Sequence, residues 1–255
     1  MKANSEEERK MLKILSIGNS FSENAQRYLK GVADSQGIEI RNVNLYIGGC
    51  SFERHVECMD NNLSDYLLEE YGTSDGKYVT LSEGLMLDDW DVITLQEVST
   101  RSYKIEEFEP YMSRLCAYVR EKCPRAKIML HMTWGYGDEE KLAPRGFGSM
   151  REMYEDIKSA YKAAMKIIGV DTVIPAGEAM QRVADAGYRV HSDGTHANGG
   201  VGEYAIALLW LKKLFGVSVK GNTFRKVRLE VSEEDMAKVA EIVDGIDVSE
   251  KAIFG

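Results

Sequence analysis

The chain has 255 residues, of which 44% are hydrophobic and 29% charged, and its formal net charge is -9 at pH 7. This composition is ordinary for a globular protein with one sizeable core, and no apolar run is long enough to cross a bilayer. The negative charge argues against nucleic acid as the main partner, because binding to a phosphate backbone depends on clustered Lys and Arg. We therefore expect one domain over residues 1–255.

The first ten residues bear on where the protein works. They are polar and include Glu6, Glu7 and Glu8, so they have neither the basic start nor the apolar stretch of a secretory signal. The chain as written is expected in the cytoplasm, although a secreted or periplasmic protein trimmed of its leader would read the same way.

The four cysteines do not form the C-x-x-C pairs of a zinc site, and we expect free thiols at Cys50, Cys58, Cys116 and Cys123. Cys116 and Cys123 lie about two turns apart on one predicted helix, roughly 10 Å, which is too far for a disulfide. The spacing leaves a bridge between Cys50 and Cys58 open.

Strand and helix patterns alternate along the chain. Five strands are predicted: short runs at residues 13–18, 91–95, 127–132 and 172–174, and an alternating pattern at residues 38–47. Apolar residues at helical spacing predict helices at about residues 21–36, 105–123, 150–168, 198–215 and 232–243, with a short capped helix at 80–87 and one or two short helices before Lys77. This order predicts an α/β fold in three α/β/α layers, in which helices cover both faces of a five-stranded parallel sheet.

Ligands bind such sheets at the carboxyl ends of the strands, and Ser20 directly follows the first of them. Its hydroxyl would lie beside the free N–H groups of the next helix, where a nucleophile can work if a base takes its proton. A serine there can also simply cap the helix.

Asp193 and His196 form the only D-x-x-H in the chain. This spacing lets the carboxylate hold the imidazole Nδ1 and leaves Nε2 free to act as a base. Two alternatives stay open. The pair can cap the following helix, or it can join His191 as ligands of a metal ion.

Three blocks together resemble the SGNH (GDSL-like) hydrolases. Residues 14–22 (ILSIGNSFS) are similar to their first block, residues 49–51 (GCS) to their second and residues 193–196 (DGTH) to their fifth. The resemblance covers about residues 12–217, with 218–255 as a C-terminal extension packed on that core, and it implies a flavodoxin-like SGNH fold. It also implies that Ser20 is the nucleophile, that Asp193 and His196 complete a triad, and that the N–H groups of Ser20 and Gly49 form the oxyanion hole.

The third block departs from the family pattern. SGNH enzymes usually carry Gly-x-Asn-Asp there, whereas this chain has Leu95-Gln96-Glu97. Gln96 has the same amide donor on a longer arm and is the expected substitute in the oxyanion hole; the alternative is a buried amide that supports the loop. The variant resembles a branch of the superfamily whose activities are mostly unassigned.

The predicted function is therefore that of an esterase acting through an acyl-enzyme, without a cofactor. Trp134 and Tyr136 follow the fourth strand, where they can stack on the substrate; the alternative is that both are partly buried packing residues. The resemblance suggests that the substrate is an O-acylated carbohydrate or another small ester. The alternatives are a metal-assisted hydrolase and a binding module that keeps the fold without turnover.

Overall fold

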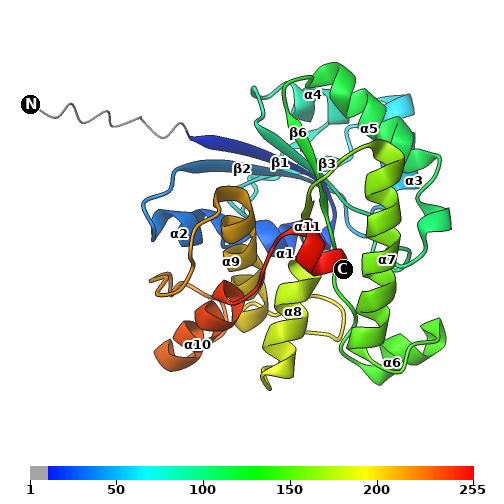
Figure 1. Cartoon of the computed structure of the whole chain (residues 1–255). Helices are drawn as coiled ribbons and strands as arrows, with labels where there is room; N and C mark the ends of the chain where they lie inside the picture. Colours follow the sequence, from blue (N-terminus) through cyan, green and yellow to red (C-terminus); the bar gives the residue numbers. More distant parts are fainter. Residues whose placement is uncertain (1–10) are drawn as a thin grey trace, which may run out of the picture.

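The computed structural model describes residues 11–255 and is built around a seven-stranded sheet of order β4-β3-β2-β1-β5-β6-β7 (Figure 1). The strands are β1 (Leu12–Gly18), β2 (Ile40–Tyr46), β3 (Tyr66–Glu70), β4 (Tyr78–Val79), β5 (Val92–Leu95), β6 (Lys127–His131) and β7 (Val173–Ile174). β2, β1, β5, β6 and β7 are the five predicted strands, and they pair in parallel.

The prediction of five strands was too low, because β3 and β4 extend the sheet beyond β2 in antiparallel pairing. Within β3 the buried residues are Tyr66 and Glu69, while Leu67 and Leu68 are half-buried. The carboxylate of Glu69 accepts a hydrogen bond from the amide of Asn44 on β2 at 2.7 Å. The strand contains a buried acid, and its apolar residues do not alternate. A search for apolar residues at every second position therefore does not find it.

Helices cover both faces of the sheet, as predicted (Figure 1). One face carries α1 (Ser20–Gln26), α2 (Leu29–Asp34), α8 (Ala176–Asp185), α9 (Val201–Phe215) and α10 (Glu233–Asp244). The other carries α3 (Phe52–Asn61), α4 (Leu81–Leu85), α5 (Tyr111–Lys122) and α7 (Met150–Ile168), with α11 (Glu250–Phe254) against α7. The short elements η1 (Ile105–Glu107), α6 (Glu139–Leu142) and η2 (Ala143–Arg145) lie in loops.

The first predicted helix is divided into α1 and α2. The carbonyl of Gln26, the last residue of α1, accepts a hydrogen bond from the Asn42 side chain at 3.2 Å. The backbone of Arg27 lies so close to Gly72 that no side chain fits at that glycine. Tertiary contacts thus end α1 where helical periodicity alone predicts that it continues.

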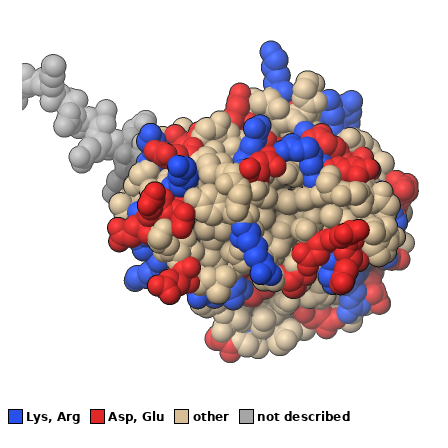
Figure 2. All heavy atoms as spheres, turned by 90° about the horizontal axis from the view of Figure 1, so that it is seen from below, with Lys and Arg blue, Asp and Glu red and all other residues tan. Residues whose placement is uncertain are grey.

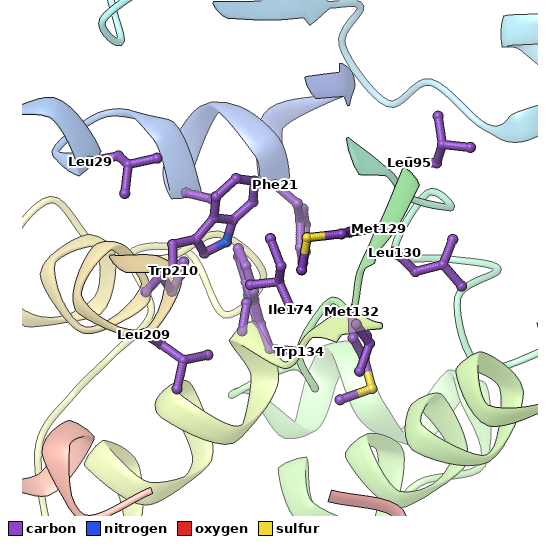
Figure 3. Close-up of a cluster of buried hydrophobic side chains, with 14 of the residues drawn as sticks. Phe21, Leu29, Leu95, Met129, Leu130, Met132, Trp134, Ile174, Leu209 and Trp210 are labelled. Carbon is purple, nitrogen blue, oxygen red and sulfur yellow. The ribbon is translucent and has the colours of Figure 1, made fainter. Parts of the chain in front are cut away.

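An aromatic and aliphatic cluster holds α1 at the carboxyl end of the sheet (Figure 3). Phe21, the residue after Ser20, stacks on Trp134 with ring centroids 4.1 Å apart. Trp210 of α9 and Ile174 of β7 pack in the same cluster. The residue beside the candidate nucleophile is therefore fixed in the core.

Polar side chains between the sheet and α1 form hydrogen bonds that fix the orientation of the helix. Ser16 and Thr94 on neighbouring strands share a hydrogen bond of 2.7 Å, and Gln26 donates to Ser16 at 2.5 Å. Ser22 of α1 donates to Asn44 of β2 at 2.8 Å. Because buried polar groups require partners, these bonds specify how α1 sits on the sheet as well as that it packs there.

Three further features, namely membrane spans, charge and cysteines, can be compared with the sequence analysis. No helix within residues 11–255 has the length and apolar character of a membrane span. On the face shown in Figure 2, acidic and basic side chains are interspersed. The four cysteines are free thiols, so the bridge between Cys50 and Cys58 that the spacing left open does not form.

Candidate active site

Ser20 is the first residue of α1, and its neighbour Asn19 caps that helix. Asn19 has extended backbone angles, and its side-chain oxygen accepts a hydrogen bond from the N–H of Phe21 at 3.0 Å. The alternative that Ser20 serves as the helix cap is therefore wrong. Its hydroxyl is left for another partner.

That partner is His196. The Ser20 Oγ lies 2.8 Å from His196 Nε2, and His196 Nδ1 lies 2.7 Å from Asp193 Oδ2. The first contact joins residues 176 positions apart in the chain, and the second joins residues three positions apart. Ser20, His196 and Asp193 thus follow one another at hydrogen-bonding distance, in the order that the nucleophile, base and carboxylate of a triad require.

The carboxylate of Asp193 is held ionised. Partial burial alone raises the pKa of Asp193, but hydrogen bonds from the backbone N–H and ring of His196 and from the N–H of Thr195 hold that pKa well below its usual range. An ionised carboxylate at Nδ1 favours the proton on that nitrogen, so Nε2 is left to accept the proton of Ser20.

Residues 191–197, which we name the triad loop, rest on the loop that follows β6. Trp134 Nε1 donates to the carbonyl of Thr195 at 2.9 Å, and the N–H of Gly137 donates to the carbonyl of Gly194 at 2.8 Å. Two backbone positions beside the carboxylate and the base are thereby fixed by the neighbouring loop.

Trp134 and Tyr136, expected to stack on a substrate, lie in the core instead. Their side chains are 0% and 1% exposed. The Trp134 ring packs on Phe21, and the Tyr136 hydroxyl lies 2.9 Å from Ser99 Oγ. Neither ring presents a face to solvent, so the structure assigns both to packing around the triad rather than to contact with a substrate.

The ligand set of the metal alternative does not come together. His191 Nε2 bonds the carbonyl of Gly135 at 3.0 Å, and no group of three His, Cys, Asp or Glu side chains within residues 11–255 is arranged to hold a metal ion. His131 is fully buried beside Trp210, and that burial lowers the pKa of His131 to about 3.

The expected oxyanion donors lie at the start of α1 and in the loop after β2. Ser20 N–H opens α1, and Gly49 is exposed with a left-handed φ of +61°. Neither N–H has a hydrogen-bond partner in the part of the chain that the structure describes. Asn19, at the start of α1, ties the two segments together, since its amide donates to the carbonyl of Cys50 at 2.8 Å.

Gln96 lies beside Asn19 and is 1% exposed. Its Nε2 donates to Asn19 Oδ1 at 2.6 Å. One N–H of the amide is therefore engaged by the residue next to the nucleophile, and the NH₂ group retains a second N–H. This contact fits the alternative of a buried amide that supports the loop, and the role of the second N–H as an oxyanion donor stays a prediction.

Glu97 is a residue of this region that sequence reasoning did not single out. It is fully buried, and its Oε1 accepts hydrogen bonds from the N–H groups of Phe52 at 3.1 Å and Val98 at 2.6 Å. Burial raises the pKa of Glu97 to about 7. The side chain holds the start of α3, which follows Gly49 and Cys50; an acid directly after a buried strand was the available signal.

Comparisons with known proteins agree with this architecture. Residues 13–243 match the model of the DUF4886 family, a domain of unknown function, and the match extends past residue 217 into α10. The crystal structure of a DUF4886 family protein from Bacteroides uniformis is 29% identical, with a TM-score of 0.81 over 92% of this chain and 93% of that one. No curated protein matches the chain by sequence.

Two more distant structures carry functional names. A protein from Slackia heliotrinireducens, provisionally assigned as an SGNH hydrolase, is 19% identical with a TM-score of 0.55 over 80% of this chain and 99% of that one. An acetyl-xylooligosaccharide esterase from Geobacillus is 16% identical with a TM-score of 0.54 over 86% and 97%. These likenesses show that the chain has the fold of SGNH hydrolases, as its sequence blocks predicted.

Proposed function

The chain belongs to the DUF4886 family, and from its triad geometry we propose that it is a serine hydrolase that cleaves esters. The observation that carries the proposal is the pair of contacts at 2.8 Å and 2.7 Å that connects Ser20, His196 and Asp193. A serine, an imidazole and a carboxylate in this order supply a nucleophile, its base and the group that orients the base.

The reaction proceeds through an acyl-enzyme. Ser20 Oγ attacks the ester carbonyl while His196 Nε2 takes the hydroxyl proton. The oxyanion accepts hydrogen bonds from Ser20 N–H, Gly49 N–H and the amide of Gln96. His196 then returns the proton to the leaving alcohol, and water activated by the same imidazole releases the acid and restores Ser20.

The proposed substrate is a small acyl ester, with an acetyl group on a carbohydrate as the first choice. The support is the shared fold of an enzyme named for acetylated xylooligosaccharides. Aromatic stacking by Trp134 and Tyr136 no longer supports a sugar, because both rings are buried.

Labelling with a fluorophosphonate probe tests the proposal, since only an activated serine reacts readily. The folded protein should be labelled at Ser20, and Ser20→Ala should abolish the label. The same two proteins should differ by several orders of magnitude in hydrolysis of p-nitrophenyl acetate. An unlabelled parent that is inactive on a panel of acyl esters and acetylated sugars would instead favour a binding module.

A further inference from the structure

The triad loop is closed on itself, so its outer contacts decide where His196 lies. The N–H of Ser192 donates to the carbonyl of His196 at 2.9 Å, and His191 pairs with Ala197 as an antiparallel bridge. These contacts join the two ends of the loop to each other. Trp134 and Gly137 hold it on the side of β6.

Asn24 holds the loop from the helix that carries the nucleophile. It lies one turn after Ser20 on α1 and is 6% exposed. Its Oδ1 accepts a hydrogen bond of 3.2 Å from the N–H of Ala197, the residue after His196. A single side chain therefore joins the helix of Ser20 to the backbone beside its base.

The side-chain amide of Asn24 fits between the N–H of Ala197 and the carboxylate of Glu203. On its other side, Asn24 Nδ2 donates to Glu203 Oε1 at 2.8 Å. The N–H of Ala197 can only donate and a carboxylate can only accept, so the orientation of the amide is determined by its two neighbours. An acid at position 24 would face another carboxylate, and an apolar side chain would leave the N–H of Ala197 without this bond and Glu203 with one donor fewer.

Glu203 is in turn held by arginines. It is fully buried in the first turn of α9, and its Oε1 accepts from Arg228 at 2.5 Å and from Arg27 at 3.3 Å. Arg228 comes from the segment after α9, whose backbone donates to the carbonyl of Gly199 at 2.9 Å. These contacts fix the acceptor to which the amide of Asn24 bonds.

We propose that Asn24 is a positioning residue that sets the location of His196 relative to Ser20, and that Glu203 and Arg228 keep its amide in place. The inference rests on the proposed hydrolase function. Asn24 does not reach the reacting atoms; it acts through the backbone beside the base. Losing it should therefore slow the chemical step and leave substrate binding unchanged.

The first test compares Asn24→Ala with Asn222→Ala, a matched control. Asn222 is 2% exposed, and it too accepts from a backbone N–H and donates through Nδ2, but its partners are Phe224 and Val32, away from the triad loop. With p-nitrophenyl acetate, well below each melting temperature, Asn24→Ala should lower kcat roughly 10- to 100-fold at nearly constant KM. The control should lose stability and keep kcat.

The second test exchanges the charges, and it stands even where Asn24→Ala does not fold. Asn24→Asp alone sets two carboxylates against each other and should be severely impaired. Combining it with Glu203→Gln restores an acceptor for the N–H of Ala197 and a donor between the two side chains, because the Gln amide takes the place of the Glu203 oxygen that Asn24 now bonds. The double variant should recover kcat to within roughly tenfold of the parent.

The results separate the two proposals. An inactive, unlabelled parent overturns the proposed function. If the parent is active, either of two results overturns the role of Asn24. The first is that kcat in folded Asn24→Ala equals kcat in the control. The second is that the exchange variant melts like the parent and stays as impaired as Asn24→Asp.

Discussion

Asn19 links three parts of the candidate site. Its side chain accepts from the N–H of Phe21 and from Gln96 Nε2, and it donates to the carbonyl of Cys50. The start of α1, the loop after β2 and the end of β5 meet at this one amide. Gln96 can therefore affect turnover in two ways, directly at the oxyanion or through Asn19.

Substitution of Gln96 distinguishes these two routes. Gln96→Ala should slow turnover by roughly 10- to 1000-fold if its amide binds the oxyanion, the range observed when one such donor is removed. A double-mutant cycle with Asn19→Ala completes the measurement. If Gln96 acts only through Asn19, its removal from the Asn19→Ala background costs nothing further. An unchanged rate in the single variant assigns Gln96 to structure alone.

Asp193→Asn should separate charge from geometry. Its oxygen can still accept from the N–H groups of Thr195 and His196, which now bond Asp193 Oδ1. The new NH₂ faces His196 Nδ1 and favours the tautomer that protonates Nε2, so kcat should fall by about 10³- to 10⁴-fold. Melting temperature should change little. Loss of structure on this substitution would contradict the assignment.

Glu97 gives a pH dependence of stability with a definite sign. Burial raises the pKa of Glu97 to about 7, so the folded protein binds this proton more tightly than the unfolded chain does. Stability from this group is fully present at acidic pH, where both states are protonated, and is lost as pH rises through the ordinary carboxyl range to about 7.

The isosteric substitution Glu97→Gln removes that titration and keeps an acceptor for Phe52 and Val98. Urea unfolding of both proteins at about pH 5 and about pH 8 should show a decline in the free energy of unfolding that is smaller in the variant, by about 2 kcal/mol. Parallel pH dependences would mean that the carboxyl is not perturbed in the folded state.

At the scale of elements, one loop supports another. The loop after β6 carries Trp134, whose ring packs on Phe21 and whose N–H holds Thr195 in the triad loop. Packing and hydrogen bonding thus converge on the same side chain. They can be separated because phenylalanine keeps much of the ring contact and has no N–H.

Trp134→Phe should cost about 1 kcal/mol, seen as a fall of about 2–4 °C in melting temperature, whereas Trp134→Ala should cost about 3–5 kcal/mol. Calorimetry measures both. KM should stay constant in Trp134→Phe because the ring is buried and does not contact substrate. A large rise in KM without loss of stability would restore the stacking role that the sequence suggested.

Elements with a local signal were predictable and those defined by distant contacts were not. Four of the five parallel strands are short apolar runs, and the fifth, β2, was predicted from alternating apolar residues. The short helix α4 has the capping box of Thr80 and Glu83 that its sequence predicts. By contrast, α8, rich in small residues and starting directly after Pro175, was not identified, and β3 hides behind the buried Glu69. The hydrogen-bond partner of Glu69, Asn44, lies 25 residues earlier in the chain.

The same distinction applies to the site within the whole molecule. Ser20, Asp193 and His196 stand in motifs whose spacing has a chemical meaning, so the sequence alone pointed to them. Asn24 and Glu203 are 179 positions apart, and each looks like an ordinary polar residue of a helix. Their relation follows from the packing of α1 on α9, which no local pattern encodes.

The C-terminal segment, predicted to be an extension packed on the core, contributes buried side chains to that core. Met236, Val239 and Val243 of α10 are fully buried, with α10 packed against α8 and α9. Burial of each is worth about 1.5–3 kcal/mol, so together they approach the 5–15 kcal/mol that stabilises a typical protein. Removing residues 218–255 would also withdraw Arg228 from Glu203 and leave that carboxylate buried with fewer partners.

A chain that ends at residue 217 should therefore aggregate or unfold without cooperativity, although the resemblance to SGNH hydrolases is confined to the part it retains. A chain that ends at residue 248 is the control, because it lacks only α11 and should fold with a lower melting temperature. Size-exclusion chromatography and thermal unfolding measure both. Cooperative unfolding of the shorter chain near the melting temperature of the full protein would show that α10 covers the core without stabilising it.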